Sequence, residues 1–259
     1  MEHRDLDIGY VFQKTFNVIG QRFAELGLLA LVLVGLPSLI ISWMASQWLE
    51  QAVAAGGTMP QFSLGFIAAN VLAGLLPIIL QAAVVHTTVE TMSNRPSDFG
   101  SSLSVALKLF LPLLLLSILL SLGYAVAFML LIIPGLILMT FWAVTVPAFV
   151  AERTGIIGAF GRSVELTKGQ RWRIFALMVV AFIAFMIAGL VLGMLSFGAM
   201  ASTQDYESFG SFSIWNALLE AVLAMVAGVV SAVGVSVLYV HLRDLKDGTT
   251  IDTISDVFR

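Results

Sequence analysis

Cysteine is absent from this chain of 259 residues, and charged residues are scarce. The absence of cysteine excludes disulfides, thiolate catalysis and cysteine-based metal sites. Charged residues make up only 11% of the chain and apolar residues 59%, whereas a soluble domain has about 25% charged residues. So much apolar surface suits lipid and not water, and the composition therefore predicts an integral membrane protein. The few basic residues are too dispersed to form a nucleic-acid-binding surface.

The thirteen lysines and arginines are confined to four short segments of the chain. These segments are residues 4–22, 95–108, 153–173 and 243–259. The intervening turns near residues 50–61, 132–135 and 200–213 contain no lysine or arginine. Because short basic loops of membrane proteins stay on the cytoplasmic side, all four segments are predicted to be cytoplasmic.

Long uncharged apolar stretches separate the basic segments. A transmembrane helix needs about 20 apolar residues, so the uncharged stretch from Leu109 to Ala151 is too long for one crossing. Pro134-Gly135 is predicted to break it. Six spans are predicted, over residues 26–48, 62–89, 110–131, 136–150, 174–199 and 214–240. They form a single polytopic membrane domain over residues 1–243, followed by a short cytoplasmic tail over residues 244–259, with both termini in the cytoplasm.

An amphipathic segment precedes each pair of predicted spans. The apolar faces comprise Ile8, Phe12, Phe16, Ile19 and Phe23 in the first segment, Phe99, Leu103, Leu107 and Phe110 in the second, and Ile157, Phe160 and Val164 in the third. Such helices lie in the headgroup plane with the apolar face down; the alternative is that they extend the spans into the cytoplasm. The predicted fold is an all-α integral membrane protein, with six transmembrane helices as three hairpins, each preceded by a cytoplasmic-side amphipathic interface helix.

Two of these amphipathic segments share a sequence string. Residues 20–23 (GQRF) lie eleven positions after Gly9, and residues 169–172 (GQRW) lie eleven positions after Gly158. A matched string at a matched offset indicates a duplicated unit of interface helix plus hairpin. The middle copy lacks the string. The units share one orientation, unlike the inverted repeats of many secondary transporters.

Polar side chains are few within the predicted spans. Asn70, Gln81 and Glu220 are the candidates for an intramembrane polar site, because polar groups in a membrane often mark a substrate or ion pathway. Two other interpretations stay open. Asn70 and Gln81 could form interhelical hydrogen bonds, and Glu220 could reach the nearby outer surface or cap the helix with Asn216.

Three further residues have metal-ligand chemistry. His86 and Glu90 are four positions apart on one helix face, and His241 ends the sixth span at the same side of the membrane. The alternative is that all three lie at the headgroup boundary, where polar side chains cost little. No nucleotide-binding loop, HExxH motif or serine with a neighbouring base occurs in the chain. We therefore assign no catalytic residue, metal or cofactor.

Prolines and small residues bear on how the spans pack. Pro37, Pro77, Pro112 and Pro147 fall in the first four spans, where freed carbonyls could line a cavity or the helices could simply be kinked. The fifth span contains Gly189-x3-Gly193. The sixth contains a row of small residues, namely Ala224, Gly228, Ala232 and Ser236. Such patterns predict close packing between these two spans or dimerisation of the hairpin.

The stretch from Ile133 to Phe175 carries a family resemblance. Its sequence IPGLILMTFWAVTVPAFVAERTGIIGAFGRSVELTKGQRWRIF resembles the bacterial YciC-like inner-membrane family and the membrane domain of some glycerophosphoryl diester phosphodiesterases. The shared features are the Pro-Gly turn, Pro147, Glu152, the Ala159-Phe160-x2-Ser163-x2-Leu166 core, Gly169 and Trp172. The tail LYVHLRDLKDG is similar too. The resemblance implies six spans without an established activity. The catalytic barrel of the fused enzymes has no counterpart in these 259 residues, so their phosphodiesterase activity is not expected here.

These observations favour a non-enzymatic multi-pass membrane protein with an organising or accessory role in the bacterial envelope. Its partners would be membrane lipids and other membrane proteins. The predicted membrane-interface residues, which would grip the cytoplasmic leaflet, are Arg162, Lys168, Arg171, Trp172 and Arg173. The alternatives are a transporter or lipid-handling protein with a cavity among the proline-kinked spans, and an integral-membrane enzyme.

Overall fold

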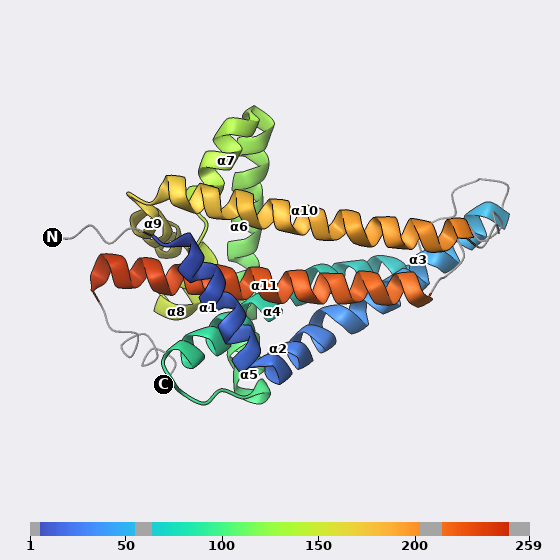
Figure 1. The fold of residues 1–259 in the computed structure, drawn as a ribbon, viewed down its shortest axis with the longest axis horizontal. Coiled ribbons are helices and arrows are strands. Elements are labelled where there is room, and N and C mark those ends of the chain that lie inside the picture. Colours follow the sequence, from blue (N-terminus) through green and yellow to red (C-terminus); the bar gives the residue numbers. More distant parts are fainter. Residues whose placement is uncertain (1–5, 55–63, 203–213, 249–259) are drawn as a thin grey trace.

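The computed structural model describes residues 6–54, 64–202 and 214–248, and all regular structure within these ranges is helical (Figure 1). In chain order the helices are α1 (Ile8–Gln21), α2 (Phe23–Ala30), the π-helical turn η1 (Leu31–Gly35), α3 (Leu36–Ala54), α4 (Leu64–Met92), α5 (Phe99–Lys108), α6 (Phe110–Leu130), α7 (Ile132–Phe141), α8 (Thr145–Glu152), α9 (Ile156–Thr167), α10 (Arg171–Ser202) and α11 (Ile214–Asp247).

Six helical stretches of the described residues are long and apolar enough to cross a membrane. They are Phe23–Ala52, Leu64–Met92, Phe110–Leu130, Ile132–Glu152, Arg171–Val191 and Ile214–Asp247. Large apolar side chains such as Leu111, Met129 and Phe182 are exposed on their outer faces. The all-α class predicted from the sequence is thus confirmed, and the six apolar helices agree with the predicted multi-pass character.

The three amphipathic segments form the short helices α1, α5 and α9. Asp7 and Asp98 are the N-caps of α1 and α5, and their side chains accept hydrogen bonds from the backbone N–H groups of Tyr10 and Ser101. Hydrogen bonds from Ser101 lower the pKa of the Asp98 carboxyl. The third copy begins differently, after Gly155, whose φ of 80° is readily adopted by glycine.

Each short helix leads directly into a long apolar helix. The single residue Arg22 separates α1 from α2, and Leu109 separates α5 from α6. Residues 168–170 connect α9 to α10, with Gly169 at a φ of 90°. The repeated GQR string therefore marks the same junction in the first and third units. The middle unit keeps the junction without the string.

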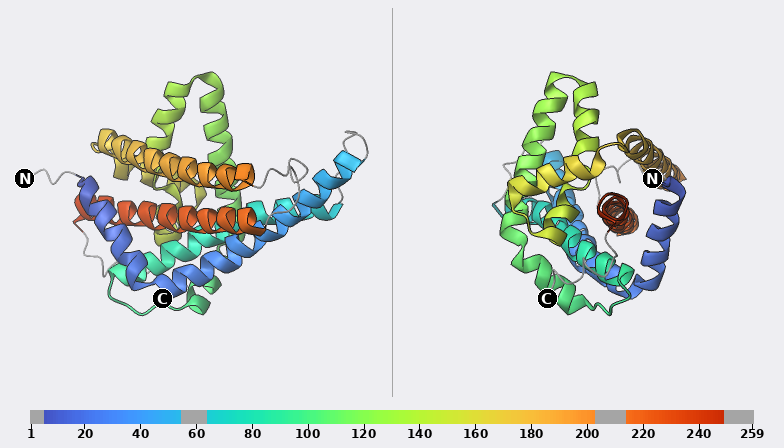
Figure 2. Two further views of the ribbon diagram at one scale, coloured as in Figure 1. Left: turned by 45° about the vertical axis from the view of Figure 1, so that its right-hand side comes forward. Right: turned by 90° about the vertical axis from the view of Figure 1, so that its left-hand side faces the viewer.

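The long helices α10 and α11 run lengthwise beside each other, and α11 packs most extensively on α4 and α1 (Figure 1). Figure 2 shows that α6 and α7 form a hairpin that runs across α10 and α11 and projects from the side of the molecule. If the three hairpins were equivalent, the helices of all three would run in the same direction as α10 and α11. The third and fourth candidate spans therefore differ in orientation from the others.

The predicted break at Pro134-Gly135 is wrong in its position. The turn between α6 and α7 is the single extended residue Leu131, and Pro134 lies in the first turn of α7. A proline is tolerated there because its missing N–H has no helical partner to lose. A second break at residues 142–144 divides the predicted fourth span into α7 and α8.

The prediction that small residues bring the last two spans together is also wrong. A Cβ atom built on Gly228 would lie 3.4 Å from Leu80 of α4, and Ala232 and Ser236 are buried in the protein core. Cβ atoms built on Gly189 and Gly193 would meet nothing within 4 Å. The small-residue row of α11 therefore packs toward α4, and the Gly-x3-Gly face of α10 is open.

Candidate functional site

Two enclosed clusters of polar side chains lie where the short helices meet the ends of the long ones. The first, termed the arginine–carboxylate cluster, joins the C-terminus of α8, the middle of α9 and the C-terminus of α11. Its members are Glu152, Arg162, Tyr239, Arg243 and Asp247. The second, termed the glutamate–hydroxyl cluster, joins α2, the end of α4 and α5. Its members are Glu25, His86, Thr87, Ser97 and Ser102.

Arg162 forms the centre of the arginine–carboxylate cluster. Its Nε donates to both carboxylate oxygens of Glu152, at 3.0 and 2.9 Å, and its Nη1 donates to Glu165 at 3.1 Å. Its Nη2 pairs with Asp247. Burial lowers the pKa of Arg162, but the bonds to Asp247, Glu152 and Glu165 outweigh burial and raise it overall. The guanidinium is therefore charged at every physiological pH.

The α11 side of this cluster is a stripe of residues four positions apart. Tyr239 donates its hydroxyl to Glu152 Oε1 at 2.9 Å, and Arg243 donates to the Tyr239 hydroxyl at 3.2 Å. Arg243 Nε lies 3.8 Å from Glu152 and 3.7 Å from Asp247. The side chains of Glu152 and Arg162 are only 12% and 16% exposed. Such enclosed charges are stable only when paired, so the cluster ties α8 and α9 to α11.

Glu25 forms the centre of the glutamate–hydroxyl cluster. Its Oε1 accepts hydrogen bonds from Thr87 and Ser102, both at 2.9 Å, and its Oε2 accepts one from Ser97 at 2.9 Å. His86 Nδ1 lies 3.2 Å from the Ser102 hydroxyl. Thr87 and Ser102 are fully buried. Three hydroxyl donors thus compensate the loss of water around a carboxylate near the start of the first candidate span.

Arg22, the residue between α1 and α2, reaches the same region. It donates from Nε to Thr91 Oγ1 at 3.1 Å, and from Nη1 and Nη2 to the carbonyls of Ser97 and Arg95 at 3.3 and 2.8 Å. These bonds hold the connection between α4 and α5 against the first unit. The GQR string therefore has a structural role in the first unit.

The predicted membrane-interface residues are placed in different surroundings. Arg162 is held by carboxylates, and Arg173 donates to the Leu6 carbonyl at 3.0 Å. Lys168 is exposed, and Trp172 is 84% exposed. The Arg171 guanidinium lies over the Phe141 ring, 3.8 Å from its centroid. The structure thus leaves Lys168 and Trp172 turned outward, whereas the three arginines contact the protein.

The three candidates for an intramembrane polar site are not brought together. Asn70 is exposed and donates to the Phe66 carbonyl one helical turn before it, at 2.9 Å. Gln81 lies on the same helix, about 16 Å further along. It lines a groove of about 300 Å³ with Ser117, Ser121 and Tyr124. Glu220 accepts a hydrogen bond from Ser42 at 3.2 Å, which links α11 to α3.

The residues with metal-ligand chemistry belong to different contacts. His86 is part of the glutamate–hydroxyl cluster, whereas the His241 ring packs on Tyr10 with centroids 4.8 Å apart. Glu90 is buried, and its carbonyl accepts from the Arg95 N–H at 2.9 Å. Among the described residues, no three His, Cys, Asp or Glu side chains form a group that could hold a metal ion.

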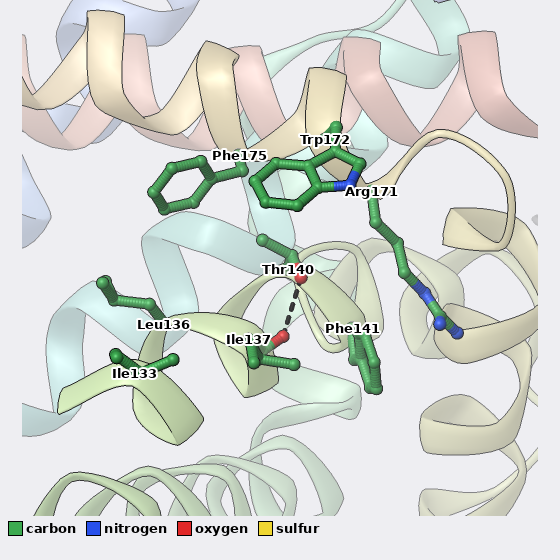
Figure 3. Close-up of a pocket in the computed structure, with 8 residues that line it drawn as sticks. All are labelled: Ile133, Leu136, Ile137, Thr140, Phe141, Arg171, Trp172 and Phe175. Atoms are coloured by element: carbon green, nitrogen blue, oxygen red, sulfur yellow. Dashed lines mark hydrogen bonds between the residues drawn. The ribbon is translucent and has the colours of Figure 1, made fainter. Parts of the chain in front are cut away.

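Two larger grooves flank α10, and their walls are mostly apolar. One, of about 460 Å³, lies between α10 and α11 and includes Phe182, Phe185 and Val235. The other, of about 400 Å³, lies between α7 and the start of α10 (Figure 3). We call it the α7–α10 groove. It is lined by Ile133, Leu136, Ile137, Thr140, Phe141, Arg171, Trp172 and Phe175.

Both polar clusters contain residues that the sequence analysis did not single out. Glu25 stands one position before the predicted first span, and its partners are 62 to 77 positions away in the chain. The hydroxyl-rich end of α4, with Thr87, Thr88 and Thr91, was an available signal. The four-residue spacing of Tyr239, Arg243 and Asp247 was another. Neither signal identifies the partner, because both clusters form only through tertiary packing.

The arrangement indicates that both clusters hold helices together and do not bind a substrate. None of the three grooves is lined by a member of either cluster. Ser102 is fully enclosed, so its hydroxyl is not presented to a substrate. Comparison with known proteins adds no assignment, because no family model, curated protein or solved structure matches the chain.

Proposed function

We propose that this chain is a non-enzymatic multi-pass protein of the bacterial inner membrane with an organising or accessory role in the envelope. Both termini are cytoplasmic in this proposal, because the four basic segments are short and uncharged apolar stretches separate them. The placement of α1, α5 and α9 in the headgroup layer follows from their amphipathic sequences. Exposed Lys168 and Trp172, at the junction between α9 and α10, support this placement.

We also propose membership of the YciC-like family. The motif residues that suggest it have clear packing roles in the structure, since Ala159, Ser163 and Leu166 are all fully buried. The Ser163 hydroxyl donates to the Phe141 carbonyl at 2.8 Å and accepts from the Val144 N–H at 3.3 Å. These contacts hold α9 against the break between α7 and α8. The shared motif therefore joins the start of the third unit to the end of the second.

The exposure of α10 is the observation that carries the organising role. Its start is anchored by buried Ile174 and Leu177. In the most apolar part of the candidate span Arg171–Val191, only 11% of the residues are buried. Beyond the anchor, one broad face of the helix is exposed, including Ile183 and Ile187, and Cβ atoms built on Gly189 and Gly193 would meet nothing within 4 Å. A helix so free of intramolecular contacts is suited to association with a helix of another membrane protein.

Site-directed photocrosslinking in native membranes tests this role. The chain has no cysteine, so one introduced cysteine carries the benzophenone label at a single site. Ile183→Cys and Ile187→Cys are expected to give a discrete protein adduct. Ile118→Cys, exposed on α6, is the matched lipid-facing control and should give much less. Adducts with lipid alone at all three positions would refute the organising role.

A lipid-handling role is the second candidate. It is favoured by the two apolar grooves that flank α10, which have volumes of about 460 and 400 Å³. Small-molecule binding sites commonly have volumes of about 300–1,000 Å³, mostly apolar walls and few polar groups. In this role the protein would retain or present lipid, and the polar clusters would keep the short helices in place.

A further inference from the structure

We infer that the α7–α10 groove is a binding site for one anionic phospholipid of the cytoplasmic leaflet, with the phosphate at Arg171 and an acyl chain along the groove. The inference rests on the membrane placement proposed above. It makes the second candidate function specific by naming the lipid class and the residue that selects it.

The walls of the groove suit an acyl chain. Ile133, Leu136 and Ile137 of α7 form one side, and Trp172 and Phe175 of α10 form the other (Figure 3). Thr140 contributes the hydroxyl of this lining, and that hydroxyl already donates to the Ile137 carbonyl at 2.7 Å. A polar ligand would therefore find few partners along these walls, whereas a hydrocarbon chain loses nothing by contact with them.

Arg171 supplies the positive charge of the groove. The guanidinium rests against the Phe141 ring, and its buried Nε has no hydrogen-bond partner. No carboxylate pairs with Arg171 among the residues that the structure describes, whereas Arg162, nine positions earlier, binds three. A guanidinium at an apolar groove without a counter-charge is suited to a phosphate, which accepts two parallel hydrogen bonds from it.

The surroundings of Arg171 favour a lipid over a soluble anion. Exposed Trp172 is the next residue, and tryptophan is enriched where hydrocarbon meets headgroups. Residues 168–173 contain three basic side chains and no acidic one, so the local field attracts anionic headgroups. The charge and the apolar walls together match a molecule that has a phosphate at one end and a hydrocarbon chain at the other.

Native mass spectrometry of the delipidated full chain tests the site. The protein is titrated in detergent with phosphatidylglycerol and with phosphatidylcholine of identical acyl chains. We expect one phosphatidylglycerol to be retained preferentially. Arg171→Gln should weaken its retention about tenfold, the loss of one charge-assisted contact, and leave phosphatidylcholine unchanged. Ile137→Trp, which fills the groove, should weaken the retention of both lipids.

Two further variants keep the outcome decisive. Lys108→Gln removes an exposed charge from the end of α5 and should retain phosphatidylglycerol like the parent. Arg171→Lys keeps the charge and should bind better than Arg171→Gln if both fold, as judged by helical circular dichroism. If Arg171→Gln does not fold, Arg171→Lys decides the charge contact by a partial loss of phosphatidylglycerol selectivity.

Three results would overturn the inference. They are unchanged phosphatidylglycerol selectivity in the folded Arg171 variants, an equal loss in Lys108→Gln, and tighter retention of oleate than of phosphatidylglycerol. The last would assign the groove to a fatty acid. Each result would leave the protein contacts of α10 unaffected, because those are tested separately by crosslinking.

Discussion

At the scale of single residues, enclosed charges hold the short helices against the ends of the long ones. Arg162 bonds to carboxylates of α8, α9 and α11, and Glu25 accepts hydrogen bonds from three hydroxyl groups that are 62 to 77 positions away in the chain. Removal of one member leaves the others without compensation in a region of low dielectric constant. The stability of the protein should therefore be more sensitive at these two residues than at any exposed lysine nearby.

Replacement of Arg162 tests this dependence. Arg162→Met leaves Glu152 and Asp247 with one guanidinium between them, and we expect the apparent melting temperature in detergent to fall by roughly 5–10 °C. Arg162→Lys keeps the charge but loses the fork of donors, so its decrease should be smaller. Lys168→Met, at an exposed site of the same segment, is the control and should melt like the parent. Equal melting of all four proteins would show that the cluster adds no stability.

At the scale of elements, close contacts of glycines fix the α6–α7 hairpin. A Cβ atom built on Gly123 would lie 2.3 Å from the ring of Trp142. Trp142 cannot easily yield, because Tyr124 packs against it with centroids 5.7 Å apart and Phe160 with centroids 4.8 Å apart. The hairpin therefore depends on a glycine at this position for packing and not for backbone conformation.

Replacing each of two glycines by alanine distinguishes a crowded site from an open one. Gly123→Ala should lower the stability by about 1–3 kcal/mol, because the methyl group overlaps an immobile ring. Gly189→Ala places the same methyl group in open space on α10 and should be neutral or stabilising by up to about 1 kcal/mol. Thermal unfolding followed by circular dichroism compares the two. A loss in Gly189→Ala as large as that in Gly123→Ala would mean that α10 is packed more tightly than the structure has it.

At the scale of the whole molecule, the long helices place the start of α1 and the end of α11 at one end, where the Tyr10 and His241 rings meet. The end of α3 and the start of α11 lie at the opposite end (Figure 1). A reporter fused after Gly56 should therefore be active only in the periplasm, and one fused after Gly248 only in the cytoplasm. Activity of both on the same side would refute the topology.

The α6–α7 hairpin makes a separate prediction, because it projects sideways from the long helices and its tip is apolar. Residues 129–133 are all large apolar side chains with most of their surface exposed. We expect Ile132→Cys, in the otherwise cysteine-free chain, to resist a membrane-impermeant maleimide from both sides and to react after detergent is added. Lys246→Cys is the control and should react from the cytoplasmic side. Labelling of Ile132→Cys in intact spheroplasts would mean that α6 and α7 cross the membrane completely.

The sequence by itself determined the class of this protein and the location of its helices. Runs of uncharged apolar residues have to be helical and in contact with lipid, since backbone groups have no other partner there. Asp7 and Asp98 cap two of the short helices through contacts with residues only three positions away, so the starts of these helices are set locally by the sequence. The repeated GQR string likewise marked the junctions at which short helices lead into long ones.

Tertiary structure alone decided which faces meet. Hydropathy shows which segments are apolar but not how their helices are oriented relative to one another. It therefore could not show that α6 and α7 run across α10 and α11. It could not show either that the small-residue row of α11 packs toward α4. The sequence predicted Arg162 as a membrane-interface residue and did not single out Glu25, and only packing brought both residues to their partners. The sequence also did not distinguish Arg171 from Lys168 and Arg173. The packing of α7 beside α10 places the Arg171 guanidinium at an apolar groove, with no carboxylate partner in the part of the chain that the structure describes.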